Sequence, residues 1–177
     1  MGNLLTFRTT VMSRGFVKEG DQEEIPLIPP RAPLPPGVAN YVTREGYDAL
    51  LREKEELESE KRNLPPGNEG ERRRAALFID GKLQLLLQRI ASARILDVQN
   101  QSKEVVRFGA VVDFWDGKEN MRFQIVGVDE ADIKQGKVAF TAPIARALIG
   151  KKEGEIADFN RRGKIQKLKI LKITYPG

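Results

Sequence analysis

The chain contains no histidine and no cysteine, so any chemistry must come from its carboxylates, lysines and arginines. This composition excludes cysteine proteases, Ser-His-Asp triads, thiol redox chemistry and Cys/His zinc sites. The residues whose type and spacing could do chemistry are Glu69 and Glu71, followed directly by Arg72, Arg73 and Arg74. A helix dipole favours acidic side chains in the first turn whatever the function. The three guanidinium groups would oppose cation binding by the two carboxylates, and they form either an anion contact or a solvated helix face.

The positive charge of the chain is concentrated at its C-terminal end. The 177 residues include 30 Lys plus Arg against 25 Asp plus Glu, a net charge of +5. Residues 151–177 alone carry eight basic and three acidic side chains. This imbalance indicates either an anionic partner, such as nucleic acid or an acidic protein surface, or a solvated lysine-rich face.

The length predicts one domain, or one domain plus an appendage. No window reaches the ~18 apolar residues of a membrane span, and no targeting segment is visible. The absence of cysteine leaves no disulfide framework and fits a reducing compartment, so we expect a cytoplasmic protein without membrane contact. Met12 is an alternative translation start, which would leave residues 1–11 outside the protein.

Residues 1–42 are predicted to form a proline-rich extended arm. Six of the ten prolines fall within residues 26–36, and proline favours polyproline II over helix or sheet. The arm is either a mobile linker or a docking strap. The second interpretation rests on four apolar residues that could act as anchors, namely Ile25, Leu27, Ile28 and Leu34.

Residues 43–97 are predicted to form two helices joined by a tight turn. Thr43 is a good N-cap, and Leu50, Leu57 and Leu64 recur every seven residues. The prolines in residues 63–68 end the first helix. Spacings of three and four place the apolar residues of the second helix on one seam, formed by Ala76, Ile79, Leu83, Leu86, Ile90 and Ala93. Two such helices predict an antiparallel coiled-coil hairpin.

Residues 98–177 change to the period of strands. Asp116-Gly117 predicts a hairpin turn. The preceding Phe114 and Trp115 are either an exposed contact patch or core residues, and at least one of them is expected in the core. Expected elements are a short helix over 142–150 and strands over 110–115, 122–128, 137–140 and 165–175. This pattern is typical of a small α+β domain, with a mostly antiparallel sheet and one short helix against it.

Several runs of residues carry a resemblance to a known family. They are residues 41–47, Phe108-Gly109-Ala110, residues 125–132 and the long Ala-Pro-Ile-Ala-Arg-Ala-Leu-Ile-Gly-Lys-Lys-Glu-Gly run over 142–154. Together they resemble the Gre family of bacterial transcription elongation factors. The resemblance spans roughly residues 41–175 and leaves the proline-rich arm outside it.

The resemblance implies a coiled-coil hairpin followed by an FKBP-like C-terminal domain. That domain would dock at the rim of the secondary channel of RNA polymerase core, and the hairpin would reach toward the active site. In cleavage-stimulating members, an Asp-x-x-Glu-Asn-type cluster at the hairpin tip helps to hold the polymerase's second Mg²⁺. The active site would belong to the partner, so we expect no enzyme activity, catalytic residue, metal site or cofactor in this chain.

The tip of this chain departs from the family pattern. It has no tip Asp and no Glu-Asn pair, and only Glu69 and Glu71 could face a metal ion. The hairpin is also shorter than that of the family. We therefore expect an RNA polymerase-binding elongation regulator without strong cleavage stimulation. The alternatives are a true cleavage factor acting through Glu69 and Glu71, a short-arm Rnk-type regulator and, by fold analogy alone, a prolyl isomerase.

The expected docking residues lie in and after the 142–150 helix. Pro143, Arg146, Lys151 and Lys152 are the interface candidates, whereas the neighbouring Ile144, Ala147, Leu148 and Ile149 are expected to pack inside the protein. We expect a monomer that contacts nucleic acid either indirectly, through the polymerase, or directly.

Overall fold

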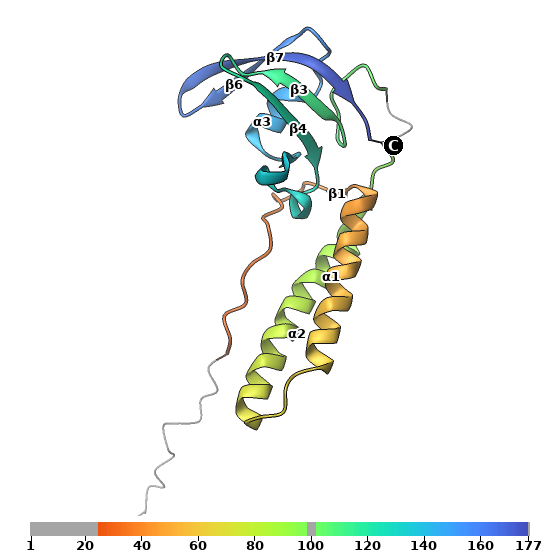
Figure 1. The fold of residues 1–177 in the computed structure, drawn as a ribbon, viewed down its shortest axis with the longest axis vertical. Coiled ribbons are helices and arrows are strands. Elements are labelled where there is room, and N and C mark those ends of the chain that lie inside the picture. The colour runs from red at the N-terminus through yellow and green to blue at the C-terminus, as the bar shows by residue number, and fades with distance from the viewer. Residues whose placement is uncertain (1–24, 99–101, 177) are drawn as a thin grey trace, which may run out of the picture.

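Two long helices form an arm that projects from a curved sheet in the computed structural model, which describes residues 25–98 and 102–176 (Figure 1). The alternative start at Met12 lies outside the described residues. Helix α1 (Arg44–Arg62) and helix α2 (Glu69–Ser92) run antiparallel along the arm. None of the helices in the described part is long and apolar enough to cross a membrane.

The predicted leucine and isoleucine seam holds the two helices together. Leu50 and Leu57 of α1 form one buried cluster with Ile79 and Leu86 of α2, and none of the four is more than 5% exposed. Local caps fix where the helices begin: the Thr43 hydroxyl accepts a hydrogen bond from the Gly46 amide. The side chain of Asn68, a cap that the sequence analysis did not identify, accepts one from the Gly70 amide. Such caps satisfy amides that have no partner within the helix.

A two-stranded parallel sheet closes the base of the arm. Strand β1 (Asn40–Val42) enters α1, and strand β2 (Ala93–Ile95) leaves α2, with Val42 paired to Ile95. Ala93, predicted on the helical seam, does pack against the buried cluster of the arm, but it does so as the first residue of β2 because α2 ends at Ser92. The backbone carbonyl of Arg89 accepts a hydrogen bond from Asn40, which is 2% exposed, so the helix end is tied to β1.

The rest of the described chain forms a five-stranded sheet with the order β5-β4-β3-β7-β6. The strands are β3 (Val111–Trp115), β4 (Asn120–Val126), β5 (Lys137–Ala139), β6 (Ile156–Arg161) and β7 (Lys164–Thr174). All neighbours are antiparallel except β4 and β5. Two short 3-10 turns, η1 (Val128–Glu130) and η2 (Ile133–Gln135), connect β4 to β5. The mixed α+β fold is therefore confirmed.

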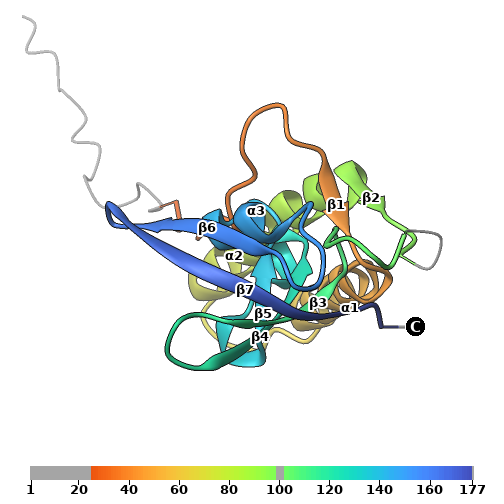
Figure 2. The ribbon, with the colours of Figure 1, turned by 90° about the horizontal axis from the view of Figure 1, so that it is seen from above.

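The core lies between this sheet and helix α3 (Pro143–Leu148) (Figure 2). Ala145 and Leu148 of α3 pack with Phe114 and Ile170 of the sheet. Because β7 bulges opposite β3, Phe114 pairs with Ile170 and Asp113 pairs with Lys172, which leaves Leu171 without a partner. The extra residue places both Ile170 and Ile173 in the core although they are three positions apart.

Strand β6 was missed from the sequence. It pairs with β7 through the turn Arg162-Gly163, whose φ angles of 52° and 79° are both left-handed. Two successive positive φ angles are typical of a tight hairpin turn. The predicted strand over 122–128 is displaced by two residues, because β4 runs from Asn120 to Val126 and Val128 begins η1.

Residues 28–39, which we call the strap, lie alongside α2 and lead into β1 (Figure 1). Ile28 lies against Gly81, where an added Cβ would come within 2.5 Å of the Ile28 side chain. Leu34 is half-buried, whereas Ile25 and Leu27 are more than 90% exposed and do not anchor the chain. The described part of the proline-rich segment thus docks on its own helix through two of its four predicted anchors.

The contribution of the buried seam to the stability of the arm can be measured by replacing two neighbouring leucines of α2. Leu86 is fully buried and Leu87 is 47% exposed. We expect Leu86→Ala to lower the free energy of unfolding by about 2–5 kcal/mol, since it leaves a cavity between the helices. Leu87→Ala, the matched control, should change it by about 0.5 kcal/mol or less. Urea unfolding of both variants checks this, and equal losses would contradict the described packing.

Candidate functional site

The tip of the arm carries the charged residues singled out from the sequence. Glu69 and Glu71 lie in the first turn of α2 and are exposed, as are Arg72, Arg73 and Arg74. The tip lies at the end of the arm that is remote from the five-stranded sheet (Figure 1). Within residues 25–98 and 102–176, no three Asp, Glu, His or Cys side chains gather closely enough to hold a metal ion.

The four predicted docking residues lie in helix α3 and in the segment that follows it. Pro143 occupies its first turn and Arg146 its last, both exposed, while Ala145 and Leu148 hold the helix against the core. Lys151 is half-buried and Lys152 is exposed in the segment that follows. Helix α3 lies beside the five-stranded sheet, away from the tip of the arm (Figure 1).

Ile149, which the sequence analysis expected to pack inside, is 38% exposed. It follows the last residue of α3 and adopts an extended conformation as the C-cap. Its side chain therefore leaves the helical face that Ala145 and Leu148 bury.

The turn η1 joins the base of the arm to the sheet. The Glu130 carboxylate accepts hydrogen bonds from the Thr43 and Gly127 amides, both at 3.1 Å, and from the Thr43 hydroxyl. Thr43 is also the N-cap of α1, so one carboxylate fixes the cap and the end of β4 together. Gly46 makes room for it, because an added Cβ there would lie 2.0 Å from the Glu130 carboxyl carbon.

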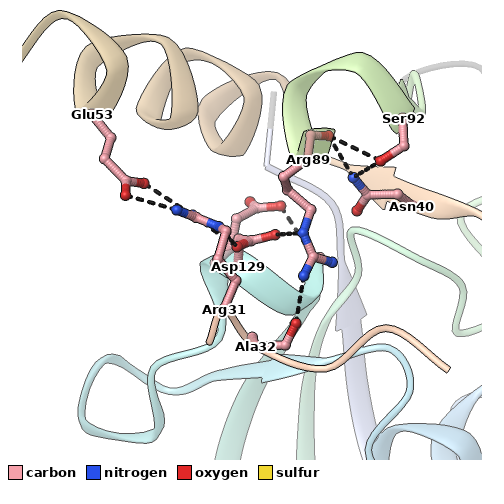
Figure 3. A network of polar contacts seen from close by, with 9 residues as sticks. Arg31, Ala32, Asn40, Glu53, Arg89, Ser92 and Asp129 are labelled. Atoms are coloured by element: carbon pink, nitrogen blue, oxygen red, sulfur yellow. Dashed lines mark hydrogen bonds and ion pairs between the residues drawn. The ribbon is translucent and has the colours of Figure 1, made fainter. Parts of the chain in front are cut away.

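Asp129, the neighbour of Glu130, joins the strap and α2 to the same turn (Figure 3). Its Oδ1 accepts a hydrogen bond of 2.9 Å from Arg31 Nε, and its Oδ2 forms an ion pair of 3.1 Å with Arg89 Nε. The second contact has the distance of an ion pair but not the geometry of a hydrogen bond. The Asp129 side chain is only 7% exposed, so the two guanidinium groups are the ionic partners of a largely buried carboxylate.

Arg31 of the strap extends this cluster to α1. Its two terminal nitrogens bind the Glu53 carboxylate in a bidentate arrangement at 2.8 and 3.0 Å. The hydrogen bond to Glu53 is the main reason that the pKa of Arg31 is raised, outweighing partial burial. Arg89 also donates to the Ala32 carbonyl of the strap at 2.5 Å. The strap, both helices and η1 therefore meet at one polar junction, which we define as Arg31, Glu53, Arg89, Asp129 and Glu130.

Aromatic rings also connect β1 to the α+β half. The Tyr41 ring lies 6.2 Å from Phe108 and 5.7 Å from Phe140, and those two rings are 5.7 Å apart. Such tilted and edge-to-face pairs are favourable aromatic geometries. The base of the arm is thus attached to the α+β half by apolar as well as polar contacts.

Comparisons with known proteins identify the class of this chain. Residues 101–175 match the family described as transcription elongation factor, GreA/GreB, C-terminal. The transcription elongation factor GreA of Phenylobacterium zucineum is 35% identical over 151 residues, covering 76% of this chain and 96% of the relative. GreA of Hyphomonas neptunium is 41% identical over 100 residues, covering 55% of this chain and 64% of the relative.

Two solved structures are also similar. The GreA factor homolog 1 (Gfh1) of Thermus thermophilus is 19% identical with a TM-score of 0.36, covering 77% of this chain and 99% of that one. A GreA/GreB factor from Nitrosomonas europaea is 21% identical with a TM-score of 0.38, covering 76% and 98%. On the strength of the nearly full-length sequence match to a GreA protein, this chain belongs to the GreA/GreB family of transcription elongation factors.

The room that Gly46 leaves for Glu130 can be tested by adding one methyl group. Alanine normally favours a helix by about 1 kcal/mol over glycine. We expect Gly46→Ala to destabilise the protein instead, by about 1–3 kcal/mol, because the new Cβ would displace the Glu130 carboxylate.

Gly70→Ala is the matched control in the first turn of α2, where the nearest neighbour of an added Cβ is the Asn68 side chain at 3.3 Å. Thermal unfolding of the two variants compares them. A stabilised Gly46→Ala protein would contradict the described contact.

Docking of the strap on α2 can be measured by a double-mutant cycle between Ile28 and Gly81. Gly81→Ala places a Cβ where Ile28 now lies, and Ile28→Ala removes the clash. The gain in helix propensity at position 81 is the same in both backgrounds and cancels in the cycle. We expect the double variant to be more stable than the sum of the single effects by about 0.5 kcal/mol or more. Additive effects in urea unfolding would show that the strap does not touch α2.

Proposed function

We propose that this protein is an RNA polymerase-binding transcription elongation regulator that works in the cytoplasm without a catalytic site of its own. The proposal is supported by its membership of the GreA/GreB family, whose relatives are named transcription elongation factors. We further propose the three-part organisation of a proline-rich arm over residues 1–42, a coiled-coil hairpin over 43–97 and an FKBP-like docking domain over 98–177.

In this proposal the hairpin enters the secondary channel of the polymerase, and the surface around α3 docks at the channel rim. The shape of the arm supports the first part. Helices α1 and α2 contain 19 and 24 residues, which correspond to about 28 and 36 Å at ~1.5 Å per residue. The second part is supported by the residues beside the buried face of α3. They are a rigid proline and three basic side chains, namely Pro143, Arg146, Lys151 and Lys152.

The charge of the tip is the observation that favours occupation of the channel over cleavage stimulation. Two exposed carboxylates, Glu69 and Glu71, are followed in the same helix by three exposed guanidinium groups. A pair of carboxylates binds a divalent cation less tightly when other positive charges lie beside the pair, because those charges repel the cation. The same arginines are suited to an anionic neighbour, such as the phosphates of a nucleic acid held inside the polymerase.

A backtracked-complex assay with purified polymerase tests this proposal. We expect little RNA shortening with the wild-type protein and no further change in the variant Glu69→Ala/Glu71→Ala. The wild-type protein should nevertheless slow the cleavage stimulated by a second, cleavage-competent Gre factor, since the two compete for one channel. RNA shortening by the wild-type protein that disappears in the double variant would favour the cleavage-factor alternative.

Docking through α3 requires a separate measurement of binding to core polymerase. We expect Arg146→Glu to weaken binding by about tenfold or more, because it places a like charge against the acidic groups that Arg146 would face. Lys118→Glu, in the β3–β4 turn, makes the same charge change away from α3 and is the control. Equal effects of both variants would contradict specific docking at α3.

A further inference from the structure

The face of the five-stranded sheet that points away from α3 meets the base of the arm at one end, where Lys137 lies 4.0 Å from Glu45 of α1. Over β3, β6 and β7 no other helix or strand of the described chain covers it (Figures 1 and 2). Side chains alternate between the two faces of a strand. The neighbours of the core residues Phe114, Leu168 and Ile170 therefore point outward. We call this surface the outer face, and it comprises Asp113, Trp115, Arg122, Ile156, Asp158, Ile165, Lys167, Lys169 and Lys172.

The outer face carries an excess of positive charge. Its two carboxylates are each bound by one basic group: Asp113 by Arg122 and Asp158 by Lys167, both at 2.8 Å. Lys169 and Lys172 have no carboxylate within ion-pair distance among the described residues. The two remaining ammonium groups belong to the C-terminal basic excess noted in the sequence.

An exposed tryptophan lies beside these lysines. Trp115 is 41% exposed, although the preceding Phe114 is 1% exposed in the core. In the strand register Trp115 is directly opposite Lys169, and Lys169 is opposite Ile156 on the next strand. Adjacent strands are ~4.8 Å apart, so the indole and the Lys169 ammonium are close enough to contact one ligand together.

We propose that the outer face binds single-stranded nucleic acid. A base would stack on Trp115, and Lys169 and Lys172 would contact the flanking phosphates. Aromatic side chains combined with basic groups on an open sheet are a common means of binding unpaired nucleotides. Every base can stack on an aromatic ring, and every phosphate carries a negative charge for a basic group. An acidic protein segment would satisfy the lysines but would leave the indole without a matching planar group.

This site goes beyond the proposed role of the arm and does not depend on it. The outer face lies at the opposite end of the molecule from the α1–α2 turn (Figure 1). A protein whose arm occupies a channel would therefore keep this face available. The binding can be measured on the protein alone, so its failure is distinguishable from a failure to bind polymerase.

Trp115 is the only tryptophan in the chain, so its fluorescence reports directly on this face. We expect quenching when an oligouridylate RNA or an oligothymidylate DNA of about twelve nucleotides is added to the full-length protein. The contribution of two or three phosphate contacts predicts about a tenfold loss of affinity when monovalent salt rises from about 50 to about 200 mM. Comparison of the two oligonucleotides determines whether RNA or DNA is the preferred strand.

Two variants assign the binding to the outer face. Lys169→Gln/Lys172→Gln should weaken binding by about tenfold at low salt and flatten the salt dependence. Lys103→Gln/Lys134→Gln removes the same charge from exposed positions outside this face and should bind like the wild type. With a dye-labelled oligonucleotide, Trp115→Ala should lose about fivefold or more in affinity, the value of one stacked base.

Three results would overturn the proposal. The first is the absence of quenching by either oligonucleotide at low salt. The second is equal weakening by the two lysine pairs, which would indicate non-specific attraction to total charge. The third is stronger quenching by an oligoglutamate peptide of the same length, which would assign the face to an acidic protein partner.

Discussion

The carboxylates of Asp129 and Glu130 are adjacent on the turn η1, and each is compensated by groups from other parts of the chain. Glu130 accepts hydrogen bonds from Thr43, where α1 begins, and from Gly127, where β4 has ended. Asp129 is 7% exposed and contacts Arg31 of the strap and Arg89 of α2. A buried carboxylate that loses its partners is strongly destabilising. The two residues therefore require the strap, the arm and the sheet to keep one arrangement.

This constraint matters because the arm is long and has little support beyond its base. The described contacts between the arm and the α+β half lie at the base of the arm, at β1, at η1 and between Glu45 and Lys137, while the tip of α2 lies at the end of a helix of 24 residues. A small rotation at the base therefore moves the tip through a much larger distance. If the arm enters a channel, as we propose, the junction determines where Glu69 and the three arginines are delivered. The strap adds a further attachment, because Arg31 binds both Glu53 of α1 and Asp129 of η1.

Much of the fold could be predicted because its signals are local. The seven-residue spacing of Leu50 and Leu57, the cap at Thr43 and the proline at the start of α3 all identify their elements directly. The junction could not be predicted, since Arg31 and Asp129 are 98 positions apart and nothing in the spacing of either residue identifies its partner. The signal that was available is the acidic pair Asp129-Glu130 soon after the end of a strand. Strand β6 was missed because its turn, Arg162-Gly163, lacks the usual Asn or Asp at the first left-handed position.

The most direct test of the junction is the distance between the tip of the arm and the sheet. The chain has no cysteine, so spin labels can be attached cleanly at Glu71→Cys and Lys164→Cys, which are both exposed. Double electron–electron resonance should give one narrow distance distribution in the otherwise wild-type protein. In Glu130→Ala, provided that circular dichroism shows the helices intact, the distribution should broaden. An equally narrow distribution in Glu130→Ala, or a broad one in the otherwise wild-type protein, would contradict the conclusion that this turn fixes the arm.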